Sequence, residues 1–146
     1  MRFLAVLVFC LSLLFSSAQT SIDEITTEFF SLYSKSPHKA IDYAFSSNKW
    51  MMDRKKDAVE SIKRKVAGDI ELLGKYYGYE KITSKSIGDS FVLVSFMVKY
   101  DRQPIRFTFV FYMPDNKWQL QNFKYDVALD EELEEAARAY RLRENR

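Results

Sequence analysis

Two pairs of ionisable residues in this chain have a spacing that could support acid–base chemistry. His38 and Asp42 are four residues apart, which places both side chains on one face if the segment is helical. A histidine beside a carboxylate can take up and release a proton near neutral pH. The alternative, which we favour, is an exposed pair in the first turns of a short helix that begins at Pro37.

Asp126 and Asp130 form the second pair, on either side of an apolar tripeptide. Two carboxylates at the mouth of a pocket can have different pKa values and divide the acid and base roles between them. We favour a structural role instead, in which Asp126 ends a strand and Asp130 caps the N-terminus of the last helix.

Metal binding and cofactor chemistry are not indicated by the sequence. His38 is the sole histidine and Cys10 the sole cysteine, so the ligands of an ordinary zinc site are missing. We assign no catalytic residue, no metal ligand and no cofactor.

Aromatic residues offer another kind of site, an apolar binding cavity. They make up 16% of the chain, and Tyr and Trp suit a cavity wall because each joins an apolar ring to a polar group. The alternative is an ordinary hydrophobic core, which these spacings favour. The candidate pocket residues are Tyr43, Trp50, Tyr79, Phe107, Phe109, Phe111 and Trp118.

The start of the chain has the features of a cleavable secretory signal peptide. Arg2 precedes an apolar run over residues 3–15, and small side chains follow as far as Ala18. The run is shorter than the ~20 residues that span a bilayer, so a retained membrane anchor is disfavoured. We predict a signal peptide over residues 1–18, a single domain over residues 19–146, and a location in the periplasm or outside the cell.

The charge balance and the cysteine content limit the partners and the source of stability. The formal net charge is +2, whereas nucleic-acid binding calls for a strongly basic surface. We therefore expect no nucleic acid and no membrane as partners. Cleavage after Ala18 removes Cys10, so the exported domain has no disulfide and depends on its hydrophobic core.

The predicted elements divide the domain into a helical first half and a strand-rich second half. Apolar residues recur at helical spacing over residues 22–34, 37–45 and 53–73. Ser21 and Glu24 fit a capping box at the first of these helices. Segregated helices and strands are typical of an α+β fold.

Four strands are predicted over residues 79–87, 90–100, 105–113 and 117–125, where aromatic and β-branched residues are frequent. The segments between them are short and rich in Gly, Pro, Asp and Asn. Such loops join antiparallel neighbours, so the sheet should be a meander. A last helix is predicted from Asp130, with its acidic residues before its arginines.

The two central strands are apolar on both faces. In residues 105–113 one face carries Phe107 and Phe109, and the other includes Val110 and Tyr112. A sheet with one solvated face alternates apolar and polar residues more cleanly. We therefore expect the second face to be covered, either by the C-terminal helix or by another subunit.

Helices followed by a curved antiparallel meander with an aromatic inner face resemble the nuclear-transport-factor-2-like (NTF2-like, cystatin-like α+β cone) superfamily. Residues 109–123 look especially like it, because an aromatic strand, a Pro-Asp-Asn turn and Lys117-Trp118 precede alternating polar and apolar residues. Small exported bacterial members often end in such a hairpin. The resemblance implies a conical pocket and a dimer, but it implies no reaction, since the fold serves enzymes and binding proteins alike.

The function that these observations favour is that of an exported, non-catalytic binding or interaction module. We expect a homodimer through the sheet and a cone-shaped pocket for a small apolar or amphipathic ligand. Two alternatives stay open: an enzyme similar to ketosteroid isomerases or dehydratases that uses a buried carboxylate or Tyr, and an interaction domain without a pocket. The enzyme ranks second because we identify no Asp or Glu at an inward-facing strand position.

Signal cleavage is tested by expressing the full sequence in a bacterial host and measuring the intact mass of the periplasmic product. We expect a mass that corresponds to a first residue of Gln19, because Ala18 presents a small side chain to the peptidase. An Ala18→Phe variant should accumulate as the precursor. Recovery of the wild-type chain uncleaved in the membrane fraction would contradict the prediction.

Overall fold

The computed structural model describes residues 20–144, which form five helices and four strands. The predicted signal peptide lies outside these described residues. The first helices are α1 (Ile22–Tyr33), α2 (Pro37–Ser46), α3 (Lys49–Arg54) and α4 (Lys56–Leu73). They are followed by β1 (Tyr76–Ile87), β2 (Phe91–Tyr100), β3 (Ile105–Tyr112), β4 (Gln119–Asp126) and α5 (Leu129–Glu144). This order confirms the predicted α+β class.

Within residues 20–144, no helix combines the length and the apolar character that crossing a membrane requires.

Local sequence signals explain where several helices begin and end. The predicted capping box is present: the Glu24 N–H donates to Ser21 Oγ at 3.1 Å, and the Ser21 N–H donates to Glu24 Oε2 at 2.6 Å. Ser36 caps α2, and Pro37 occupies its first position. Gly74 follows α4 with a φ of 85°, in the left-handed region that favours glycine.

The segment between α2 and α4 differs from the prediction. It contains the short helix α3, capped by Asn48, whose Oδ1 accepts a hydrogen bond from the Met51 N–H at 3.2 Å. Asn48 is buried, and its Nδ2 donates to the Leu120 carbonyl of β4 at 3.0 Å. Since α3 ends at Arg54, α4 begins at Lys56 rather than at Asp53.

The four strands form an antiparallel meander in the order β1-β2-β3-β4, as the short loops predicted. Irregularities in register fall on the edge strands. Tyr77 and Ile82 of β1 and Gln121 of β4 are left without a directly opposite residue. Each is therefore a bulge that locally changes which way the following side chains point.

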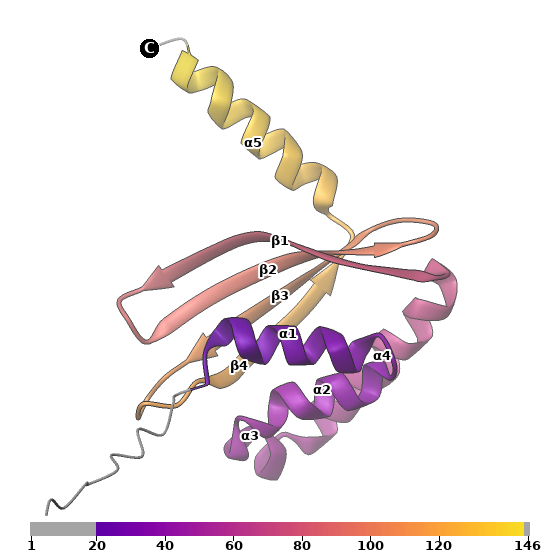
Figure 1. Cartoon of the computed structure of the whole chain (residues 1–146), viewed down its shortest axis with the longest axis vertical. Coiled ribbons are helices and arrows are strands. Elements are labelled where there is room, and N and C mark those ends of the chain that lie inside the picture. Colours follow the sequence, from indigo (N-terminus) through magenta and orange to yellow (C-terminus); the bar gives the residue numbers. More distant parts are fainter. Residues whose placement is uncertain (1–19, 145–146) are drawn as a thin grey trace, which may run out of the picture.

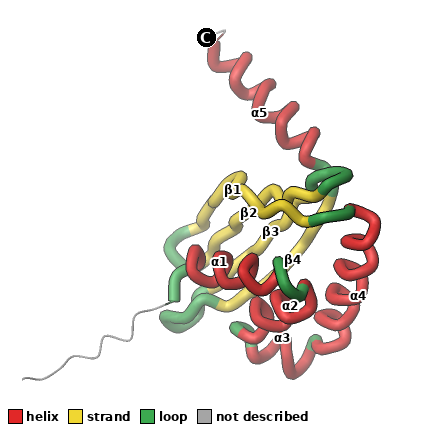
Figure 2. The backbone as a smooth tube through the Cα atoms, turned by 45° about the vertical axis from the view of Figure 1, so that its right-hand side comes forward, coloured by secondary structure: helices red, strands yellow, loops and turns green. Residues whose placement is uncertain are grey.

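The helices α1 to α4 cover one face of the sheet, which we call the inner face (Figure 1). The other, outer face has no helix packed along it, and α5 leads away from the body beyond the end of β4 (Figures 1 and 2). We expected either the C-terminal helix or another subunit to cover the second face. The C-terminal helix α5 does not cover it.

The core is a cluster of aromatic rings between α1 and the inner face. Phe29 and Phe30 of α1 pack against Phe107 and Phe109 of β3, with ring centroids 4.9 to 6.2 Å apart. All four rings are buried. Aromatic pairs at these distances add to the hydrophobic gain from burial, so this contact joins the helical layer to the sheet.

Replacing Phe109 by Ala tests the core. The ring is fully buried, so we expect Phe109→Ala to lower the free energy of unfolding by about 3–5 kcal/mol, measured by urea denaturation. Tyr112→Ala, on the outer side of the same strand and 41% exposed, should cost about 1 kcal/mol or less. Equal losses would contradict the assignment of the two faces.

Candidate functional site

The seven aromatic residues predicted to line a pocket fall into two groups. Phe107, Phe109 and Phe111 are fully buried core rings. Tyr79 joins them through Phe30, on which it stacks with a centroid distance of 3.8 Å. These four side chains lie together between the helices and the inner face, packed against other rings.

The remaining three aromatic candidates lie outside this buried group, with Tyr43 and Trp118 half-buried at the edge of the core and Trp50 exposed. Tyr43 borders a shallow hollow whose other walls include Asp23 and Glu28 of α1. Trp118 borders a second hollow, beside Lys81 of β1. Trp50 is 55% exposed on α3. The structure therefore does not gather the seven candidates around one cavity.

The structure places both His38 and Asp42 on α2, where Asp42 is half-buried and pairs with α4. His38 is exposed in the first turn of α2. Asp42 pairs with Lys63 of α4 at 2.8 Å, and Lys63 also contacts Glu60 at 2.9 Å. The hydrogen bond that Lys63 donates to Asp42, followed by the one that it donates to Glu60, raises the pKa of Lys63. These contacts tie α2 to α4.

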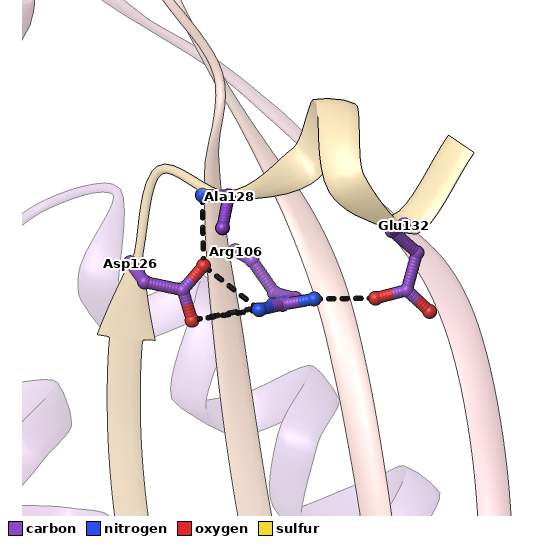
Figure 3. Close-up of polar contacts among 4 residues, drawn as sticks. All are labelled: Arg106, Asp126, Ala128 and Glu132. Atoms are coloured by element: carbon purple, nitrogen blue, oxygen red, sulfur yellow. Dashed lines mark hydrogen bonds and ion pairs between the residues drawn. The ribbon is translucent and has the colours of Figure 1, made fainter. Parts of the chain in front are cut away.

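Asp126 contributes to an ion-pair cluster at the base of α5, centred on Arg106 (Figure 3). The Arg106 guanidinium donates to Asp126 through Nε at 3.2 Å and Nη2 at 3.1 Å, and through Nη1 to Glu132 of α5. Asp126 Oδ1 also accepts from the Ala128 N–H at 3.0 Å. Asp130 does not cap the helix as predicted, because α5 begins at Leu129 and Asp130 lies in its first turn.

The Arg106 cluster is only partly buried, and its charges connect neighbouring elements of the fold. Burial opposes the charge of Arg106, but the hydrogen bonds that it donates to Asp126 and Glu132 outweigh this effect and raise the pKa of the guanidinium. The planar guanidinium holds two carboxylates in defined directions. It therefore links β3, β4 and the first turn of α5.

A group of tyrosines at one end of the core is the nearest approach to catalytic machinery. The hydroxyls of Tyr33 and Tyr100 lie 2.6 Å apart, and the ring of Tyr76 contacts both residues. Burial raises the pKa of all three phenols, that of Tyr76 to about 12. A raised pKa keeps these phenols protonated at physiological pH, so one of the Tyr33 and Tyr100 hydroxyls donates to the other and neither carries the negative charge of a base.

Buried carboxylates, which the enzyme alternative could use, are not found in the described part of the chain. The buried polar side chains of residues 20–144, apart from the tyrosines, are Thr26, Asn48 and Ser95. The same residues contain no group of three or more His, Cys, Asp or Glu side chains that could hold a metal ion. Within residues 20–144, the tyrosine group is therefore not accompanied by a buried carboxylate or a metal-ligand cluster.

The outer face of the sheet carries a depression of about 510 Å³. Its apolar walls cross three strands: Ile87 of β1, Phe91 and Leu93 of β2, and Val110 of β3. Leu93 of β2 pairs with Val110 on the neighbouring strand β3. Phe91 of β2 pairs with Ile87 on the other neighbouring strand, β1. The depression therefore rests on paired residues of a hydrogen-bonded sheet, which is a rigid support.

Polar residues border the same depression at both edges of the sheet. Lys85 and Ser86 lie on β1, and Gln121 and Asn122 lie on β4. The bulge at Gln121 lets two consecutive amide side chains reach the depression, whereas a regular strand would send them to opposite faces. An apolar floor with a few polar groups at its rim is typical of a small-molecule site.

Sequence reasoning found part of this site and missed the rest. The apolar second side of the central strands indicated Phe91, Leu93 and Val110 as residues in need of a cover. Nothing local marked Lys85 or Gln121, because their position depends on the register of two edge strands.

The tyrosine group predicts a loss of stability at high pH. Unfolded tyrosines ionise near pH 10, whereas burial keeps Tyr33 neutral well above that pH. The contribution of Tyr33 to the free energy of unfolding should therefore be fully present below pH 10. Above pH 10 the free energy of unfolding should fall by about 1.4 kcal/mol per pH unit because of this residue. Urea denaturation from pH 8 to 11.5 measures the slope.

Two variants separate the ionisation from simple destabilisation. Tyr33→Phe should flatten the slope above pH 10, because one buried phenol is gone. Val98→Ala, at a fully buried position of β2, should lower the stability at every pH and keep the wild-type slope. An unchanged slope in Tyr33→Phe would contradict the assignment.

In comparisons with protein-family models, curated proteins and solved structures, no match to this chain was found. The resemblance to the nuclear-transport-factor-2-like superfamily therefore stays a prediction, and the functional argument rests on the residues and geometry described above.

Proposed function

We propose that the chain is an exported, non-catalytic binding module that holds a small amphipathic ligand on the outer face of its sheet. The observation that carries this proposal is the depression lined by Ile87, Phe91, Leu93 and Val110. Its volume of about 510 Å³ lies in the range of small-molecule sites. A binding site on this face differs from the cone-shaped pocket expected from the resemblance.

The rim of the depression favours a ligand with a polar or anionic end. Lys85 borders the depression at one edge, and Gln121 and Asn122 border it at the other. Partial burial of an ion pair between Lys85 and an anionic group strengthens it relative to an exposed pair. The apolar part of the ligand would cover Leu93 and Val110 and remove their surface from water.

The alternatives use other parts of the structure. A homodimer through the sheet would cover the same outer face, with a second copy in place of the ligand. An enzyme of the isomerase type would need a substrate to reach the buried hydroxyls of Tyr33 and Tyr100. The outer-face proposal needs neither a rearranged core nor a buried charge, which is why we rank it first.

Fluorescence titration with 1-anilinonaphthalene-8-sulfonate, an apolar ring system with one anionic group, tests the site. We expect the wild-type chain to bind one molecule. Leu93→Asp should weaken binding at least tenfold, because it places a charge on the apolar floor. Leu72→Asp, at an exposed leucine of α4, is the matched control and should bind as the wild type does.

A second substitution tests the anionic end. Lys85→Ala should weaken binding of the sulfonate severalfold, whereas Lys49→Ala on α3 should not. Circular dichroism confirms that each variant is folded. Equal binding by wild type and Leu93→Asp would contradict the proposed site. A native mass spectrum that shows a ligand-free dimer, lost in Leu93→Asp, would instead support the homodimer through the sheet.

A further inference from the structure

The helix α5 presents apolar side chains to solvent along most of its length. Leu133 and Tyr140 are 71% and 62% exposed. With Leu129 and Ala136 they recur at intervals of four, three and four residues, which is the heptad spacing of a coiled-coil seam. Leu129 is buried at the base of the helix, so the seam begins at the body and continues outward into solvent.

The charges of α5 are divided between its two halves. Five carboxylates, from Asp130 to Glu135, lie in the half nearest the body, and the arginines Arg138, Arg141 and Arg143 lie in the outer half. The division complements the helix dipole. It also makes the helix complementary to a second copy of itself that runs in the opposite direction.

We propose that α5 pairs antiparallel with α5 of a second copy of this chain. The two-fold axis would pass beside Ala136 and Ala137, where small side chains let the helices approach closely. Leu133 would then contact Tyr140 of the second copy, and the reverse contact would form by symmetry. The interface lies on α5 and is separate from the depression on the outer face of the sheet.

Helix geometry gives the charged contacts of this pair. At 100° per residue, Asp130, Glu134 and Arg141 lie along one flank of the seam. Two-fold symmetry brings like flanks together, so Arg141 of the second copy falls between Asp130 and Glu134. Glu132 and Arg143 lie on the opposite flank and meet in the same way. A parallel pair would instead bring unlike flanks together and place Glu134 beside Glu132 of the second copy.

The attachment of α5 to the body favours the association. Short helices are marginal on their own in water, but Leu129 is buried and Arg106 binds Glu132, so the first turns of α5 are already held. Less conformational entropy is then lost on pairing. A helix of 16 residues is about 24 Å long, and antiparallel pairing sets the two bodies at opposite ends, where they do not collide.

Sedimentation equilibrium of the exported chain tests the proposal. We expect a reversible dimer with a dissociation constant in the micromolar range, since the seam spans only about two heptads. Leu133→Ser should weaken the dimer at least tenfold. Leu93→Asp should leave it unchanged. A chain that stays monomeric at about 1 mM, or a dimer lost in Leu93→Asp and kept in Leu133→Ser, would overturn the proposal.

Charge reversal tests the antiparallel direction. Glu134→Arg and Arg141→Glu should each weaken the dimer about tenfold, because each places like charges together twice by symmetry. The double variant should regain wild-type association, since the pair is restored with its signs exchanged. Glu131→Arg is the matched control: it makes the same charge change at an exposed position on the side of α5 opposite the seam and should have little effect.

The single and double variants together also exclude a parallel dimer and a general effect on the helix. In a parallel pair Glu134 would lie beside Glu132 of the second copy and Arg141 beside Arg143, so each single charge reversal would strengthen the dimer instead of weakening it. Loss of helix would lower the ellipticity in the double variant as well as in the single ones. Failure of the double variant to associate, with its helix intact, would overturn the antiparallel arrangement.

Discussion

Insertion of the two α1 phenylalanines between the rings of β3 is the contact on which the rest of the structure depends. Phe29 and Phe30 each reach both Phe107 and Phe109. The described residues contain no cysteine, so no disulfide shares this task. The inner side of β3 packs against α1. Its outer side, which includes Val110, lines a depression that no helix covers.

A single guanidinium determines where the C-terminal helix goes. Arg106 binds Asp126 at the end of β4 and Glu132 in α5, and it is itself on β3. The helix therefore leaves the sheet in a direction set by side chains 20 and 26 residues apart in sequence. Apolar residues of α5 and of the outer sheet face remain separate surfaces, each able to serve a different partner.

Features with a local cause could be predicted from the sequence, and features with a distant cause could not. The capping box at Ser21 and the meander of four strands follow from nearby residues and short loops, and both were predicted correctly. Helix α3 was missed because Asn48 is held by a carbonyl 72 residues away. The amide rim of the depression was missed because Gln121 owes its position to a bulge between β3 and β4.

The bulges of the edge strands have a consequence for the behaviour of the protein at high concentration. A straight, unpaired strand edge is a template for the edge of another molecule, which leads to aggregation. Here both outermost strands are interrupted, at Tyr77 and Ile82 in β1 and at Gln121 in β4. A neighbouring molecule cannot extend a continuous ladder along such an edge. The bulges thus act against edge-to-edge association in a sheet whose outer face carries exposed apolar side chains.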